Sequence, residues 1–150
     1  MSKEPNLIKE VKWAYSYTLD TIPQQGKEHN KLYLFYDNLR GGKLTTTQCR
    51  DCGKTSWPPR TVCPECLSDN LEWVNLPDTG KILYFTVQVS GAPPGYELPL
   101  IFAAIEITPE IRFIGRIIEA DPEQLNVGQT VRVKAVPVPG GRVLPAFVPG

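Results

Sequence analysis

The sequence predicts a mainly β protein with an N-terminal helical segment, a small ribbon built around a metal ion, and a five-stranded barrel. Three observations lead to this prediction. Four cysteines stand as two C-x-x-C pairs with ten residues between the pairs, apolar runs of strand length fill the second half of the chain, and 15 prolines and 12 glycines punctuate the sequence. Short strands separated by such turn residues are typical of barrels and sandwiches.

The N-terminal part predicts one strand and one helix. Large apolar side chains recur at every second position from Val11 to Leu19, which is typical of a strand with one buried face. From Glu28 the apolar spacing changes to three and four residues, and Gly41-Gly42 supplies a left-handed stop. We expect a helix over about 28–40, followed by a short strand that leads into the first cysteine pair.

The remaining strands are expected after the second cysteine pair. A short one covers Leu71 to Val74, and five more cover residues 81–89, 100–107, 111–119, 130–136 and 142–148. Asp121, Pro122 and Gln124 carry a helix-start signature, and Gly128 limits that helix to a single turn.

Five strands with a short helix between the third and the fourth describe the Greek-key barrel known as the OB-fold. A partial alternation places Ile82, Tyr84 and Thr86 on one face of the first barrel strand, opposite Leu83, Phe85 and Val87. Both faces are apolar in places, which indicates a barrel that is also covered on its outside. The expected units are an N-terminal extension (1–42), the ribbon (43–76) and the barrel (77–150).

Composition excludes several classes of function. Sixteen basic residues balance sixteen acidic ones, so the chain has no cationic excess with which to neutralise phosphates. The N-terminus lacks the apolar stretch of a signal peptide, and nowhere do eighteen apolar residues follow one another. We therefore expect a cytoplasmic protein without a membrane partner, in which paired cysteines are metal ligands rather than disulfides.

The two cysteine pairs predict a tetrahedral site formed by Cys49, Cys52, Cys63 and Cys66. Gly53 follows the first pair, where the chain must turn tightly, and Pro64 stiffens the second. An ion held by four sulfurs has no open coordination position, so its role would be structural. Zinc is the expected ion and iron the alternative; a redox dithiol or disulfides are the other interpretations of the same residues.

Catalytic groups are scarce, and we expect no catalytic residue. His29 is the only histidine and is expected at the surface or at the start of the predicted helix. The hydroxyls that could act as nucleophiles have no histidine near them in the sequence: Ser56, Ser68 and Ser90. The carboxylates Glu106, Glu110 and Glu119 are expected to face solvent from strands or turns.

Two groups of residues could contact a ligand. Five aromatic side chains of the barrel could stack on bases but, without basic neighbours, are expected in the core: Tyr84, Phe85, Phe102, Phe113 and Phe147. The segment Trp57-Pro58-Pro59-Arg60 lies between the cysteine pairs. It either packs the ribbon on the barrel, with Arg60 paired to an acid, or lets Arg60 or Lys54 meet an anionic ligand or a partner.

The order of these motifs resembles a known family. It runs from a helix through Gln48-Cys49-Arg50-Asp51-Cys52-Gly53, Trp57-Pro58-Pro59-Arg60, Cys63-Pro64-Glu65-Cys66 and Leu71-Glu72-Trp73 to a barrel that begins near Gly80 and holds Leu125-Asn126-Val127-Gly128. Over about residues 28–150 this resembles the acyl-CoA-associated proteins with a rubredoxin-like zinc ribbon and an OB-fold, long catalogued as a domain of unknown function.

The resemblance implies a partner of CoA-ester enzymes. Members of the family accompany thiolase-like enzymes, bridge an acetoacetyl-CoA thiolase and a hydroxymethylglutaryl-CoA synthase, or accompany aldolases and hydratases of steroid CoA esters. The leading hypothesis is therefore a non-catalytic accessory subunit in lipid metabolism that helps to bind or channel acyl-CoA, with Lys54, Trp57, Arg60 and Tyr96 as candidate contacts. A nucleic-acid-binding module is the alternative, and electron transfer through iron is the third hypothesis.

Overall fold

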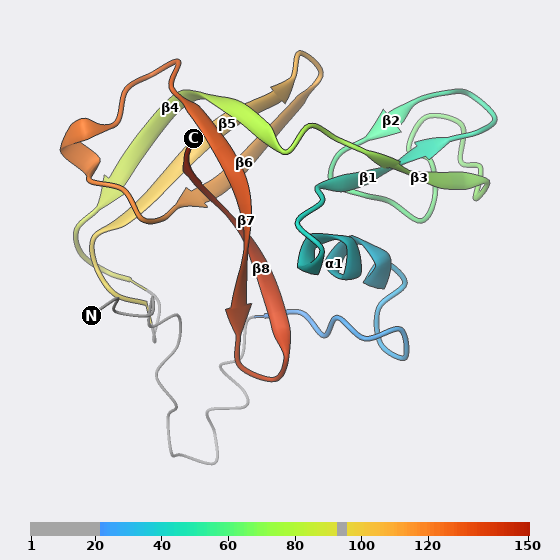
Figure 1. Ribbon diagram of the computed structural model, residues 1–150. Helices are drawn as coiled ribbons and strands as arrows, with labels where there is room; N and C mark the ends of the chain where they lie inside the picture. The colour runs from blue at the N-terminus through green and yellow to red at the C-terminus, as the bar shows by residue number, and fades with distance from the viewer. Residues whose placement is uncertain (1–21, 93–95) are drawn as a thin grey trace.

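The computed structural model describes residues 22–92 and 96–150, so the strand predicted over residues 11–19 lies outside the described residues. One helix, α1 (Tyr33–Arg40), precedes a three-stranded antiparallel sheet. The strands of that sheet are β1 (Thr45–Cys49), β2 (Thr55–Ser56) and β3 (Leu71–Asn75), and their order is β2-β1-β3. Figure 1 shows this small sheet beside a larger barrel, with α1 between them.

The barrel confirms the predicted OB-fold class. It is closed in the order β4-β5-β6-β8-β7, and its strands are β4 (Thr79–Gln88), β5 (Leu100–Thr108), β6 (Ile111–Ile117), β7 (Thr130–Val138) and β8 (Arg142–Pro149). Each end lies within two residues of the predicted one. The predicted short helix is the 3₁₀ turn η2 (Pro122–Gln124), whose cap residue Asp121 accepts a hydrogen bond from the Glu123 backbone N–H.

The prediction that Ile82, Tyr84 and Thr86 share a face of β4 is wrong at Ile82. A register shift lies between Ile82 and Tyr84, so an extra residue, Leu83, is inserted opposite β5. Such a bulge reverses which side chains point inward. Ile82 is therefore buried, whereas Tyr84 is 63% exposed on the outside. Of the five aromatics expected in the core, Tyr84 and Phe102 instead lie on the surface.

Helix α1 begins five residues later than predicted. The Asn30 side-chain oxygen accepts a hydrogen bond from the Leu32 backbone N–H, and its amide donates to the Gln24 carbonyl. An Asx turn of this kind offers the backbone an alternative to the helix. The C-terminal end agrees with the prediction, because Gly42 has a φ of +79° just after the last turn.

Aromatic rings join the helix, the ribbon and the barrel. Phe35 of α1 lies edge-on to Trp57 of the ribbon at 6.1 Å, and Trp57 lies 5.0 Å from Phe113 of β6. Phe113 in turn lies 5.1 Å from the fully buried Phe147 of β8. Aromatic pairs at these separations add stability beyond the area that they bury. The ring chain Phe35–Trp57–Phe113–Phe147 thus fixes the small sheet on the barrel.

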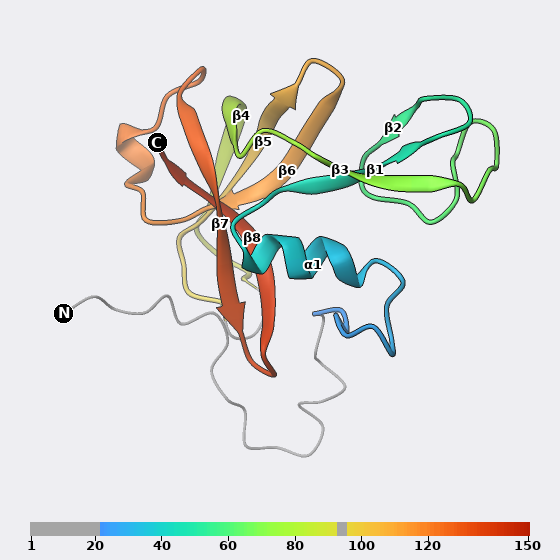
Figure 2. The ribbon, with the colours of Figure 1, turned by 45° about the vertical axis from the view of Figure 1, so that its right-hand side comes forward.

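The segment before α1 is held against strand β8. Gln25 is only 3% exposed, and its side-chain amide donates to the Val143 carbonyl and accepts from the Val143 N–H. These two bonds replace the ones that a neighbouring strand would make. Figure 2 shows α1 between the small sheet and the β7–β8 hairpin. No helix within the described residues is long and apolar enough to cross a membrane.

We expect Phe35→Ala to lower the free energy of unfolding by about 3–5 kcal/mol, because it removes a buried ring from the junction. Denaturant unfolding followed by Trp fluorescence would measure this, since Trp57 contacts that ring. Phe102→Ala is the matched control, because Phe102 is 36% exposed and should change stability by less than about 1 kcal/mol. Equal losses in the two variants would contradict the role given to the ring chain.

Candidate metal centre

The four cysteine sulfurs meet at one point between the two cysteine turns. Cys49 Sγ lies 3.6 Å from Cys66 Sγ, Cys52 Sγ lies 3.5 Å from Cys63 Sγ, and all four atoms are within 4.8 Å of one another. A disulfide would need about 2.05 Å. Sulfurs around a tetrahedral zinc ion at about 2.3 Å stand about 3.8 Å apart. The observed separations fit a tetrahedral site.

The two cysteine turns have the same backbone design. In each turn the first cysteine's N–H donates to a carbonyl five residues later, and its own carbonyl accepts from the residue four later. The residue after the second cysteine is left-handed in both turns, with φ of +77° at Gly53 and +62° at Leu67. Glycine adopts this conformation freely, whereas leucine is strained there. In the sequence, Gly53 therefore indicates the left-handed residue of the first turn, whereas Leu67 gives no sign that the second turn has the same conformation.

Backbone N–H groups point at the sulfurs and change their acidity. The Cys66 N–H lowers the pKa of Cys63 to about 7, and the Cys52 N–H lowers the pKa of Cys49. The pKa of Cys66 is raised to about 12: the Ser68 N–H lowers it, but the neighbouring Cys49 sulfur and burial outweigh that effect. The chain alone thus favours ionisation at two sulfurs and opposes it at Cys66, so a cation is needed to hold all four as thiolates.

Polar side chains connect the two turns and the end of the small sheet. Lys54 of the first turn pairs with Glu65 of the second at 2.8 Å. Asp51 accepts hydrogen bonds from the Ser68 hydroxyl and the Asn70 amide, and Ser68 lowers the pKa of Asp51 most. These contacts are exposed and each is worth little in water. These contacts set the relative position of the two turns, whereas a bound ion would contribute most of the free energy that stabilises them.

The candidate contact residues do not form one site. Lys54 is already paired with Glu65. Trp57 belongs to the ring chain, so the packing interpretation of its segment fits the structure, although Arg60 pairs with no acid within the described residues. Tyr96 lies on the barrel instead, with its ring centroid 5.5 Å from the Arg116 guanidinium carbon.

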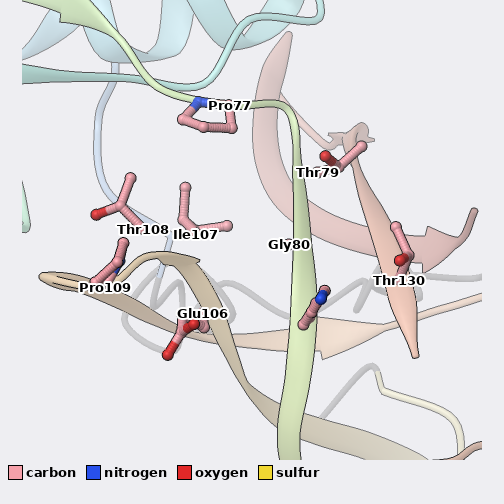
Figure 3. A pocket seen from close by; sticks show the side chains of 9 residues that line it. Pro77, Thr79, Gly80, Glu106, Ile107, Thr108, Pro109 and Thr130 are labelled. Carbon is pink, nitrogen blue, oxygen red and sulfur yellow. The ribbon is translucent and has the colours of Figure 1, made fainter. Parts of the chain in front are cut away.

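A pocket of about 290 Å³ opens where the ribbon joins the barrel. Figure 3 shows Ile107, Thr108 and Pro109 on one side of it, with Gly80 and Thr130 on the other. Its charged groups are Lys81 and Glu106, and neither histidine nor cysteine lines it. The pocket could hold a small polar group but contains no nucleophile–base pair.

The other groups considered for chemistry serve the fold or face solvent. His29 is exposed in the turn before α1. The Ser56 carbonyl accepts a bond from the Thr46 hydroxyl, and Glu119 pairs with Lys134 at 2.5 Å. Sequence reasoning missed Arg116, which is half-buried without a carboxylate within 4.0 Å among the described residues. The sequence signal for Arg116 was the alternation in β6, which puts it on the same outward face as Ile114.

Two family models match adjoining parts of the chain. "ChsH2, rubredoxin-like zinc ribbon domain" matches residues 39–72, and "ChsH2, C-terminal OB-fold domain" matches residues 73–136. Among solved structures, "Ltp2-ChsH2(DUF35) aldolase" has a TM-score of 0.70 at 23% identity and covers 80% of this chain and 95% of that one. At this identity the likeness concerns the fold.

Curated relatives carry several names. A "DUF35 domain-containing scaffold protein" of Methanocaldococcus jannaschii is 32% identical over 91 residues, which are 59% of this chain and 64% of that protein. A "Benzoylsuccinyl-CoA thiolase subunit BbsA" of Thauera aromatica is 29% identical over 62% of this chain and 68% of that one. A "Probable enoyl-CoA hydratase alpha subunit" of Thermomonospora curvata is 24% identical over 77% of this chain. The match spans only 36% of that last protein's length.

We expect Cys66→Ser to abolish binding of one zinc ion per chain and to unfold the ribbon while leaving the barrel folded. The reason is that the ribbon has few apolar side chains, whereas zinc contributes roughly 10–16 kcal/mol of apparent binding energy in small zinc-binding peptides. Elemental analysis measures the metal, and amide hydrogen exchange locates the unfolding. Ser68→Ala is the control, because it removes a hydroxyl that contacts Asp51 and leaves all four sulfurs. Equal metal content in Cys66→Ser and the parent would refute the assignment.

We expect zinc affinity to fall as pH falls from 8 to 6. In the metal-free chain the raised pKa values of Cys52 and Cys66 keep both thiols protonated in this range, so binding must release at least their two protons. Two released protons change the affinity by about a hundredfold per pH unit. Competition with a chromophoric chelator measures the slope, and an affinity independent of pH would contradict the thiolate set.

Proposed function

Because the chain belongs to the family that carries a ChsH2-type rubredoxin-like zinc ribbon followed by a ChsH2-type OB-fold, we propose that it is a non-catalytic accessory subunit of an enzyme that acts on CoA esters. The observation that carries this proposal is a closed four-cysteine cluster in a chain whose pocket beside Gly80 is lined by no nucleophile–base pair. Such a chain contributes surfaces rather than chemistry.

The metal in this proposal is zinc, held by Cys49, Cys52, Cys63 and Cys66. The tetrahedral spacing of the sulfurs and the zinc-ribbon family model support this choice. With four sulfur ligands the ion takes no water or substrate, so it stabilises the cysteine turns and does not activate a reactant. In the same proposal residues 43–76 form the ribbon unit and 77–150 the barrel unit, with 1–42 as the extension.

The names of the relatives support the partner class. Scaffold proteins, a thiolase subunit and hydratase subunits all occur among them, and three of those names mention CoA. We propose that the partner belongs to the thiolase superfamily or resembles hydroxymethylglutaryl-CoA synthase, and that acyl-CoA is bound or passed on within the complex. Tyr96 and Arg116 are the contact candidates that remain accessible on the barrel.

One observation favours the alternative of a single-stranded nucleic-acid-binding module. Tyr84 and Phe102 are exposed on the outer face of the first barrel strands, a face that OB-folds use for oligonucleotides. The balanced charge of the chain opposes it, since such binding depends on cations along the phosphates. Titration of a fluorescent oligothymidine at low salt distinguishes the two functions: binding that weakens steeply with added salt would favour the alternative.

We expect the tagged chain, purified from its native source, to elute from gel filtration together with a CoA-ester enzyme in a fixed ratio. Mass spectrometry identifies the companion, and the tag expressed alone is the control. Recovery of the chain by itself, with no CoA-ester enzyme attached at any salt concentration, would overturn the proposed function.

A further inference from the structure

The outer face of strands β4, β5 and β6 exposes three large apolar side chains. Tyr84 is 63% exposed, Phe102 36% and Ile114 74%. The strand register gathers them: Tyr84 pairs with Ala104 on β5, and Ala104 pairs with Ile114 on β6. Directly paired side chains stand about 5 Å apart, and Phe102 is their diagonal neighbour. Ala104, which lies between Tyr84 and Ile114, is only 2% exposed, so the accessible apolar surface is that of Tyr84, Phe102 and Ile114.

This arrangement departs from the usual pattern of a solvated sheet. Antiparallel strands that face water alternate apolar residues inside with polar residues outside. Thr86, Arg112 and Arg116 follow that pattern on the same face, whereas Tyr84 and Ile114 do not. Contiguous apolar groups rimmed by polar ones mark interaction sites on soluble proteins. The bulge at Leu83 is what turns Tyr84 outward, so the exposure is built into the backbone of β4.

The rim of this face is cationic. The row Lys81–Glu106–Arg112 borders the apolar residues at one end, and the row Thr86–Phe102–Arg116 crosses them at the other. Arg116 is half-buried, it lies beside the Tyr96 ring, and no carboxylate of the described residues lies within 4.0 Å of it. A half-buried cation is costly unless an anion pairs with it. The face therefore has three cations for one anion.

We infer that this face, formed by Tyr84, Phe102, Ile114 and Arg116, docks a partner protein that packs an apolar side chain against Tyr84 and Ile114 and places carboxylates against Arg116 and Arg112. The inference rests on the proposed function and assigns the partner's surface to the barrel rather than to the ribbon. A buried apolar centre with charges at its rim is the usual anatomy of such an interface.

Charge decides against two other occupants. In a symmetric dimer the same patch meets itself, which would bring the arginines of both copies together without carboxylates to match them. A single strand of nucleic acid needs a row of rings for its bases. Here the aliphatic Ile114 interrupts the rings as the most exposed apolar residue of the face, and Glu106 stands in the border row.

Site-specific photo-cross-linking tests the inference in the native source. Ile114 is replaced by p-benzoylphenylalanine, and Leu67 is replaced in the same way as the matched control. Leu67 is an aliphatic residue with 76% exposure on the second cysteine turn, which belongs to the ribbon and not to the barrel. We expect the probe at 114, and not the one at 67, to cross-link a peptide of the CoA-ester enzyme that carries Asp or Glu beside apolar residues.

Charge variants supply the second readout on the reconstituted complex. We expect Ile114→Asp and Arg116→Glu each to weaken binding by about tenfold or more, and added salt to slow association of the parent. Lys43→Glu, an exposed substitution in the turn after α1, should change the affinity by less than about threefold. Unchanged circular dichroism and metal content show that each variant is folded.

The outcomes separate this inference from the proposed function. If the unmodified chain recovers the enzyme but the probe at 67 cross-links it and the probe at 114 does not, the surface is wrong and the function stands. If the unmodified chain recovers no CoA-ester enzyme, the proposed function fails. The docking face is then still supported if the probe at 114 cross-links a peptide with Asp or Glu from another protein. Adducts at 114 with a second copy or with nucleic acid, or no adduct, overturn the inference.

Discussion

The contact between Trp57 and its two aromatic neighbours, Phe35 and Phe113, is the interaction on which the arrangement of this protein depends. The ribbon has little apolar surface of its own, and only residues 76–78 connect it to the barrel. Trp57 therefore links the ribbon to the barrel through the ring chain, while Gln25 and Arg40 also hold the helix segment on the β7–β8 hairpin. The cis peptide bond between Trp57 and Pro58 belongs to the same segment.

The metal cluster and the ring chain perform different physical tasks. Four sulfurs around one point hold the two cysteine turns in register, and the balance of raised and lowered thiol pKa values calls for a cation at that point. The ring chain then places the finished ribbon against the barrel. Neither task leaves a reactive group available, which is why the proposed function is assigned to surfaces.

The surfaces themselves are unequal. On the ribbon, exposed charges are paired in Lys54–Glu65 and Arg50–Glu72, while Arg60 has no carboxylate partner among the described residues and Leu67 is exposed singly. On β4, β5 and β6 the barrel gathers several exposed apolar side chains beside Arg116, which contacts the Tyr96 ring but has no carboxylate within 4.0 Å among the described residues. An association driven by apolar burial and directed by unpaired charge would therefore use the barrel.

The sequence by itself determined those features that depend on neighbours along the chain. The C-x-x-C spacing brings two sulfurs together within one turn, and Asp121 caps its short helix as its motif predicted. Apolar runs between turn residues placed the barrel strands within two residues of their ends. The strand β2 was missed because two residues carry no periodicity, and the start of α1 was misplaced because the Asn30 side chain competes with the helix.

Only the tertiary structure decided which face of each strand is covered. An alternating pattern shows that the two faces of a strand differ, but not which face packs against the core. Within β4 the bulge at Leu83 also puts Tyr84 on the opposite face from Ile82. For the same reason Tyr84 and Phe102 were expected inside and lie outside. Trp57 and Tyr96, both candidate contacts for a ligand or partner, lie on different parts of the molecule, because strand pairing and ring packing join residues that no local pattern connects.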